Sequence, residues 1–171
     1  MNQVPVWFER KFEFGFPDAL LPNLCARLRG TPARLEEMLR DRPPELMGRR
    51  RGQKWSAQEH AGHMGDLEPL WIARIEDFVA GAKQLTAADL SNRKTDTANH
   101  NARKIEPILS EFRHGRSQLL ERLEQLKPEA FRQTILHPRL QQPMRVVDHL
   151  YFVAEHDDHH LARIWELFAA G

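Results

Sequence analysis

Apolar side chains recur at helical spacing in four stretches of the chain, separated by polar connections that contain proline or glycine. The first expected helix spans roughly residues 18–40, and its leucines share one face: Leu20, Leu24, Leu28, Leu35 and Leu39. Gly30–Thr31–Pro32 predicts a kink, because threonine often caps a helix start and proline fits a first turn. Asp41–Arg42–Pro43–Pro44 predicts the end, since proline cannot continue the hydrogen-bond ladder.

The second stretch has the clearest start signal. Ser56–Ala57–Gln58–Glu59 is a capping box, in which the serine and glutamate side chains satisfy free backbone N–H groups. The helix is expected to run to Ala80, to stop at Gly81 and to kink at Pro69. Its predicted inward face carries two histidines among apolar residues: His60, His63, Leu67, Leu70, Trp71, Ile75 and Phe78.

Residues 82–104 are polar and aperiodic, and this length favours a short helix or a functional loop. The third helix is expected from about Pro107 to Leu126, with one apolar face: Ile108, Leu109, Phe112, Leu119, Leu120 and Leu123. Residues 127–143 are predicted to connect it to the last helix, with a short extended segment at Gln133–Leu136.

The pattern therefore predicts an all-α protein, one helical-bundle domain over residues 1–171 with an extended arm at residues 1–16.

The formal net charge is +1, which argues against partners such as nucleic acid or a membrane. Arg49–Arg50–Arg51 is the only basic run, and a solvated loop explains it. Cys25 is the only cysteine, so neither an internal disulfide nor a thiolate metal cage is expected. The absence of a signal-peptide pattern and of a long apolar run predicts a cytoplasmic protein.

The fourth expected helix, from about Met144 to Phe168, places His149, His156 and His160 near its apolar side. His156 and His160 are four residues apart, which stacks their Cβ atoms about 5–6 Å from each other. Two such imidazoles can converge on one ion, and His63 would face them from the second helix. Three neutral imidazoles suit one divalent transition metal such as Zn, Ni, Fe or Cu, and they leave a coordination position open.

A competing interpretation treats each inward histidine as an ordinary core residue. An unpaired buried imidazole costs about 1–3 kcal/mol, so several on one apolar stripe favour a shared metal. Asp157 is expected to orient a neighbouring ligand imidazole. His159 points about 100° away from His160 and is expected at the surface. The other histidines divide into two that are expected to be solvated, His114 and His137, and two whose roles stay open, His60 and His149.

Two motifs of the chain resemble those of a known family. Trp55–Asp66 is similar to the W-S-x-x-E-x-x-x-H-x-x-D entry to the second helix of DinB-like (DinB/YfiT) proteins, and Glu155–Ile164 resembles their H-x-x-x-H signature. The resemblance covers roughly residues 16–168. It implies a four-helix bundle of up-down-down-up type, with a long crossover between the second and third helices. It also implies that the family's metal triad falls on His63, His156 and His160.

The leading hypothesis is an enzyme, since the resemblance is to a family whose members of known activity are mostly metal-dependent thiol transferases and a thiol-dependent isomerase, although many members have no assigned activity. The expected partner is a small-molecule substrate with a low-molecular-weight thiol, and a homodimer is left open. Candidate catalytic residues are Asp66, Asp157 and Arg116. Arg116 and Arg74 interrupt apolar helix faces and would either anchor substrate or play a structural role, in which each snorkels to the edge of the bundle or pairs with a neighbouring acid. One alternative is metal-dependent hydrolysis with Asp66 or Asp157 as general base. Another is a non-catalytic, metal-binding stress-response protein, whose site would have no pocket beside the ion.

Overall fold

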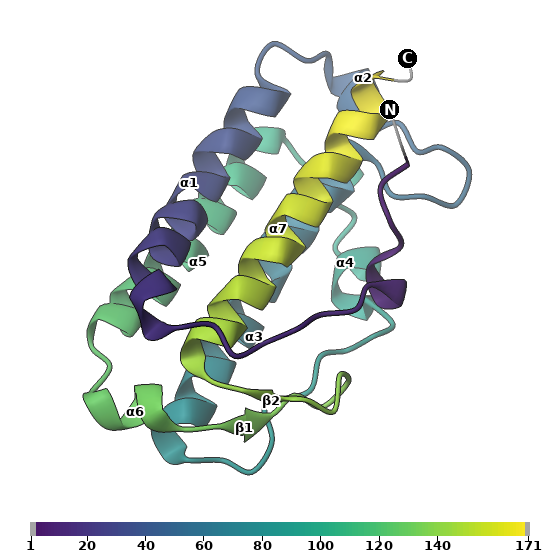
Figure 1. Cartoon of the computed structure of the whole chain (residues 1–171). Coiled ribbons are helices and arrows are strands. Elements are labelled where there is room, and N and C mark those ends of the chain that lie inside the picture. Colours follow the sequence, from purple (N-terminus) through teal and green to yellow (C-terminus); the bar gives the residue numbers. More distant parts are fainter. Residues whose placement is uncertain (1–2, 170–171) are drawn as a thin grey trace.

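The structure, a computed structural model, describes residues 3–169, and long helices dominate it (Figure 1). The long helices are α1 (Leu21–Leu39), α3 (Ala57–Ala80), α5 (Ile105–Glu124) and α7 (Val146–Ala169). Shorter elements occupy the arm and the connections: η1 (Trp7–Glu9), η2 (Asp18–Leu20), α2 (Pro44–Met47), α4 (Arg93–Thr97), η3 (His100–Ala102), α6 (Pro128–Arg132), β1 (Ile135–Leu136) and β2 (Pro143–Met144). Within the described residues, no helix is long and apolar enough to cross a membrane.

The four long helices form the predicted bundle. Helix α1 packs against α5 and α7, and α3 packs against the same two helices. In Figure 1, α1 and α7 run in one direction and α3 and α5 run in the other. The connection between α3 and α5, residues 81–104, must therefore return along the bundle, and it carries α4 and η3 on the way. The expected up-down-down-up order and the long crossover are confirmed.

Local sequence signals set the ends of α3 as predicted. Ser56 is the N-cap and accepts from the backbone N–H of Glu59, while the Glu59 carboxylate accepts from the Ser56 N–H. At the other end Gly81 adopts φ 62°, a left-handed conformation that glycine reaches without strain. By contrast, α1 runs without a break through Gly30–Pro32, so Thr31 does not cap a new helix. Its hydroxyl instead donates to the carbonyl of Arg27, one turn earlier.

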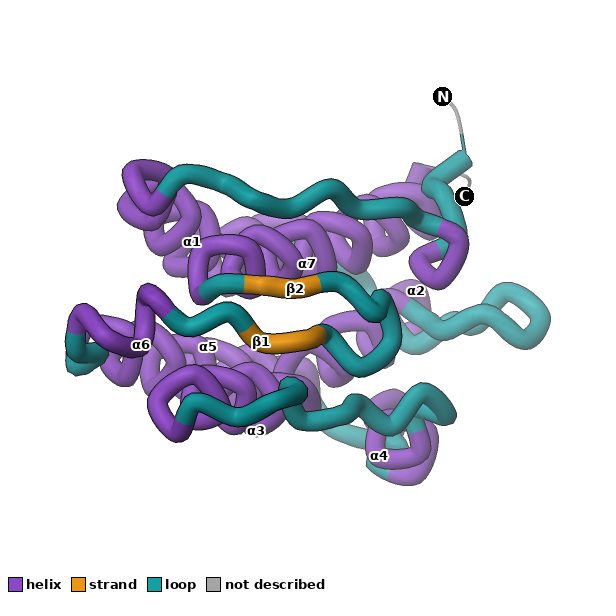
Figure 2. The backbone as a smooth tube through the Cα atoms, turned by 60° about the horizontal axis from the view of Figure 1, so that its bottom comes forward, coloured by secondary structure: helices purple, strands orange, loops and turns teal. Residues whose placement is uncertain are grey.

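The connection between α5 and α7 folds over one end of the bundle (Figure 2). It contains α6 and a small antiparallel pair of strands, in which Ile135 lies opposite Met144. Ile135 and Met144 are both fully buried in the main hydrophobic cluster. The extended segment expected at residues 133–136 is therefore present, and it closes the end of the core.

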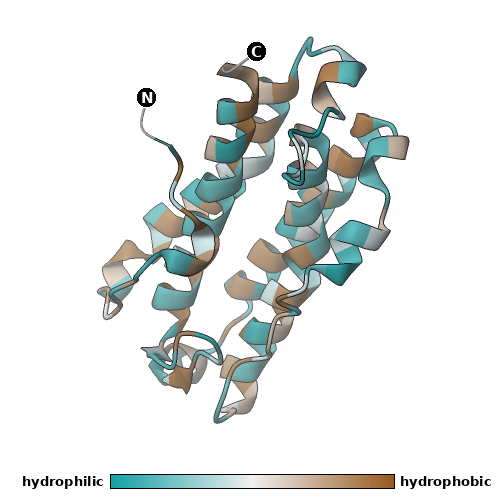
Figure 3. Cartoon of the chain, turned by 90° about the vertical axis from the view of Figure 1, so that its right-hand side faces the viewer, coloured by the Kyte–Doolittle hydropathy of each residue, from teal (hydrophilic) through white to brown (hydrophobic). Residues whose placement is uncertain are grey.

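The described part of the N-terminal arm, from residue 3 onward, lies along the outside of the bundle. Phe12 is buried, and Trp7 and Phe14 pack on the same hydrophobic cluster. The carboxylate of Asp148, at the start of α7, accepts from the backbone N–H groups of Gly15 and Phe16. Figure 3 shows apolar and polar residues alternating along the long helices, the pattern that gives each helix one face to bury.

A buried ion-pair network joins the long helices at the centre of the bundle. Arg116 of α5 donates to the Leu28 carbonyl of α1 at 3.1 Å, to Glu68 of α3 at 2.6 Å and to Asp157 of α7 at 2.6 Å. Arg116 is only 1% exposed. Burial raises the pKa of Glu68 to about 7, even though Arg116 acts in the opposite direction. Arg116 therefore pairs with neighbouring acids, one of the two roles expected for it.

Removing Arg116 should destabilise the bundle strongly. Arg116→Met leaves Glu68 and Asp157 buried without a cation, and breaking such a pair costs about 3–5 kcal/mol. The matched control is Arg122→Met on the same helix, which removes a surface ion pair with Glu76 and should cost less than about 1 kcal/mol. Urea denaturation of both variants measures the difference. Equal losses would contradict the central role of Arg116.

Candidate metal centre

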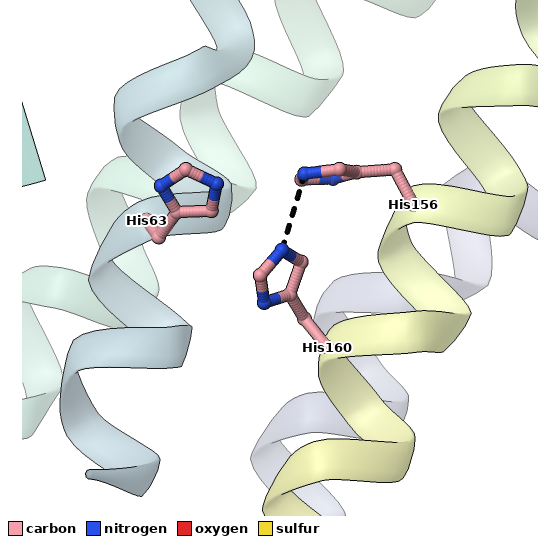
Figure 4. A group of neighbouring side chains, drawn as sticks. All are labelled: His63, His156 and His160. Carbon is pink, nitrogen blue, oxygen red and sulfur yellow. Dashed lines mark hydrogen bonds between the residues drawn. The ribbon is translucent and has the colours of Figure 1, made fainter. Parts of the chain in front are cut away.

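Three histidines converge between α3 and α7 (Figure 4). His63 comes from α3, and His156 and His160 come from successive turns of α7. One nitrogen of each ring lies within 4.8 Å of the others, and Nε2 of His156 lies 3.1 Å from Nε2 of His160. Each residue is at most 5% exposed. The packing of α3 on α7 thus brings together the three residues that the spacing predicted.

The crossover fixes the orientation of the His63 ring. Nδ1 of His63 lies 2.9 Å from the Thr95 hydroxyl, which donates to the carboxylate of Asp66 at 2.9 Å. Nε2 of His100 reaches the same carboxylate oxygen, also at 2.9 Å. His63 therefore donates through Nδ1 and keeps the lone pair of Nε2 free, the tautomer that a metal ligand requires.

A second contact orients His160. Its Nδ1 lies 2.8 Å from Nδ1 of His60, so its Nε2 is left to face His156. His156 has no such support, because its buried Nδ1 has no hydrogen-bond partner among residues 3–169. The expectation that Asp157 orients a ligand imidazole is wrong: among the described residues its carboxylate accepts from Arg116 and forms no hydrogen bond with a histidine. His60, whose role was open, proves to position His160.

Protonation and spacing both suit a bound cation. Burial lowers the pKa of His63 to about 4, and it lowers those of His156 and His160 well below 6.5. The rings are therefore neutral near pH 7, as metal binding requires. Tetrahedral ligands about 2.0–2.1 Å from zinc stand about 3.3 Å apart, close to the separation of the two α7 nitrogens. The residues present thus fit a three-histidine metal site.

Close packing between α3 and the crossover supports this arrangement. Gly62 lies beside His63 on α3, and a Cβ atom placed on it would come within 2.4 Å of the His100 ring. No side chain fits at that distance, so only glycine permits His100 to reach Asp66. His100 and Thr95 lie in the aperiodic crossover, and no pattern in the sequence marked either of them as part of the site.

The three histidines line a cavity of about 1110 Å³. Its walls include three tryptophans close to the histidines and one phenylalanine: Trp7, Trp55, Trp71 and Phe152. The three candidate catalytic residues, Asp66, Asp157 and Arg116, are not among the residues that line it. Asp66 is held by Thr95 and His100, and Asp157 pairs with Arg116. The structure therefore places these residues behind the histidines rather than on the cavity wall.

Two expectations about single histidines are wrong. His159 is not at the surface: it is 9% exposed, because the arm covers that side of α7 and brings Trp7 within 5.5 Å of its ring. His137 is not solvated either: it is 2% exposed, because it begins the turn between β1 and β2 and packs against Phe152 of α7 and Arg74 of α3. Both residues line the cavity. His114 is exposed on α5, as expected, and His149 is fully buried in the core.

Fold and site together define a helical bundle with a buried cluster of metal-binding residue types. The DinB superfamily model matches residues 27–164, and the chain belongs to this superfamily. No curated protein matches the chain significantly.

Two solved structures share the fold. The first is YfiT from Bacillus subtilis, described as a probable metal-dependent hydrolase with an unusual four-helix bundle topology. It is 16% identical, with a TM-score of 0.77, over 93% of this chain and 91% of that one. The second is the mycothiol-dependent maleylpyruvate isomerase, 11% identical, with a TM-score of 0.68. That match covers 87% of this chain and 61% of the isomerase. At these identities the likeness concerns the fold.

The buried neutral histidines should make the metal-free protein sensitive to mild acid. Burial lowers the pKa of His149 well below 6.5, so the unfolded chain takes up this proton before the folded one does. The stability that His149 contributes is complete above about pH 6.5 and is lost as the pH falls below that value. At about pH 5.5 the loss for one such residue is about 1.4 kcal/mol.

Urea denaturation at about pH 7.5 and about pH 5.5, with a chelator present, measures this effect. In His149→Leu, the free energy of unfolding should fall less between the two pH values, by the amount that one histidine contributes. His114→Leu changes an exposed residue and should keep the wild-type dependence. If the free energy of unfolding of His149→Leu falls with pH as much as that of the wild type, His149 is not a source of the acid sensitivity.

Proposed function

We propose that this protein is a metal-dependent enzyme that acts on a small molecule, with one divalent transition metal ion held by His63, His156 and His160. One observation carries the proposal: the three neutral imidazoles converge on the wall of a large cavity. A non-catalytic metal-binding protein would need no such space beside the ion. Three ligands from the protein also leave a coordination position open toward the cavity.

The leading reaction is transfer of a low-molecular-weight thiol. A divalent ion at this site would act as a Lewis acid and lower the pKa of a thiol or water that reaches it. Hydrolysis also calls for a general base at the reacting water, and neither Asp66 nor Asp157 lines the cavity. A thiol needs less help, because its reference pKa of about 8.5 lies much closer to neutral pH than that of water. The aromatic walls suit the apolar part of a second substrate.

Hydrolysis remains the second candidate, and one observation favours it. His159 lines the cavity next to His160, and its ring centre lies 5.3 Å from that of His160. A neutral imidazole in this position can accept a proton from a reacting water. Two of the structural neighbours are described as a probable metal-dependent hydrolase and as a mycothiol-dependent isomerase, so their descriptions are compatible with either candidate. His159 would then be the general base that sequence reasoning assigned to a carboxylate.

Metal content of purified variants tests the site directly. His63→Ala, His156→Ala and His160→Ala should each lower bound zinc or nickel sharply, because each removes one of three ligands. His159→Ala should keep the metal, since His159 is outside the three-histidine group. His114→Ala, on the exposed face of α5, controls for folding and handling. Equal metal loss in His159→Ala would require a different ligand set.

Activity assays separate the two reactions. Zinc- or nickel-loaded protein should couple low-molecular-weight thiols to an electrophile such as 1-chloro-2,4-dinitrobenzene about tenfold faster than the His160→Ala variant does. The same protein is assayed for hydrolysis of 4-nitrophenyl acetate without thiol. Hydrolysis that depends on the metal and on His159, with no thiol transfer, would favour the second candidate. If metal-loaded protein shows neither thiol transfer nor hydrolysis, that result would count against both candidate enzymes.

A further inference from the structure

Arg74, on α3, is a buried cation without an acidic partner. It is 2% exposed and lines the cavity, and among the described residues no carboxylate lies within ion-pair distance of it. Its Nε donates to the Thr86 carbonyl at 2.9 Å, and its guanidinium lies 5.4 Å from the centre of the Trp71 ring. Arg116 is equally buried but is paired with two carboxylates. A buried charge without a partner costs several kcal/mol, so the position of Arg74 requires a reason.

His137 faces Arg74 in an arrangement that lacks an acceptor. Nδ1 of His137 lies 3.2 Å from the backbone nitrogens of both Arg139 and Leu140, and it accepts from their N–H groups. The neutral ring then carries its proton on Nε2, which lies 3.2 Å from Nη1 of Arg74. Two donors therefore face each other. The opposite tautomer removes this contact between donors but creates another one, because Nδ1–H would then point at the backbone N–H groups of Arg139 and Leu140.

Arg139 adds a second guanidinium to the same wall of the cavity. Its Nη2 is buried and has no hydrogen-bond partner among residues 3–169. Its guanidinium lies 5.3 Å from the ring of Phe8, and burial lowers its pKa. Two arginines and one histidine thus place N–H groups on one part of the cavity wall, and among residues 3–169 neither arginine forms an ion pair with an acid there; Asp77 acts on Arg74 only at longer range.

This cluster lies one aromatic ring away from the three histidines. The Trp71 ring contacts Arg74 on one side and lies 5.5 Å from the ring of His156 on the other. Phe152 similarly lies 5.1 Å from His137 and packs 5.2 Å from Trp7. A small molecule that reaches the histidines can therefore place its other end on the cluster.

We propose that Arg74, His137 and Arg139 form a subsite for a carboxylate of the substrate. A carboxylate has two oxygens and about four acceptor positions, so one group can accept from both arginines and from Nε2 of His137. It would also supply the negative charge that Arg74 lacks. This inference rests on the proposed function and refines it: the substrate or its thiol is an acid, with the carboxylate at one end and the reacting atom at the other.

Calorimetry with a matched pair of thiols tests the subsite. The probes are 3-mercaptopropionate and its uncharged analogue 3-mercapto-1-propanol, titrated into zinc-loaded protein. The carboxylate should bind about tenfold tighter, and Arg74→Met or Arg139→Met should each remove most of that preference. Arg122→Met removes a surface arginine of α5 and should leave the preference unchanged. Equal affinity for the two probes in wild-type protein, or a preference that survives both cavity variants, overturns the subsite.

Chelated protein separates failure of the subsite from failure of the metal site. Succinate should bind to metal-free wild-type protein, and binding should weaken about tenfold in Arg74→Met. Arg74→Met should also unfold at a urea concentration equal to or above that of the wild type, because it removes an unpaired charge. No succinate binding to the folded wild-type protein would contradict the subsite even if zinc binds normally. A marked loss of stability in Arg74→Met would show a structural role instead.

Discussion

Arg116 carries a full positive charge into the centre of the bundle, where the other three long helices supply its acceptors. Its partners are the Leu28 carbonyl, Glu68 and Asp157. The helices cannot slide past one another without leaving this charge, or one of the two carboxylates, unpaired in a dry interior. Asp157 follows His156 directly, and Glu68 lies just over one turn beyond His63. The same contacts that join the helices therefore set the register in which the three histidines meet.

Arg74 and Arg116 show what sequence reasoning could not resolve. Both interrupt apolar faces of helices in the same manner, and the sequence predicted the same two roles for each. The difference lies in residues far away along the chain. Acids from α3 and α7 reach Arg116, whereas Arg74 meets a carbonyl, an indole and an imidazole. Which partner a buried charge finds is a property of the packed bundle.

The sequence predicted features that depend on only one or two helical turns. These are the capping box at Ser56, the glycine end of α3 and the proximity of His156 to His160. Predictions of exposure failed where a distant segment covers the residue. The arm covers His159, and Arg74 of α3 and Phe152 of α7 pack on His137. Thr95 was missed for a related reason, because no periodicity in the crossover indicates which residue will face α3.

The contact between Gly62 and His100 divides the crossover into two parts with separate tasks. The later part is locked against α3, because the missing side chain of Gly62 leaves room for the His100 ring and Thr95 holds His63. The earlier part, which includes Ala87, Ala88 and Leu90, lines the cavity. Insertions or replacements in the earlier part can therefore reshape the cavity while the histidines stay in place. One loop thus allows proteins of this architecture to diverge in the shape of the cavity while the histidine cluster beneath it stays unchanged.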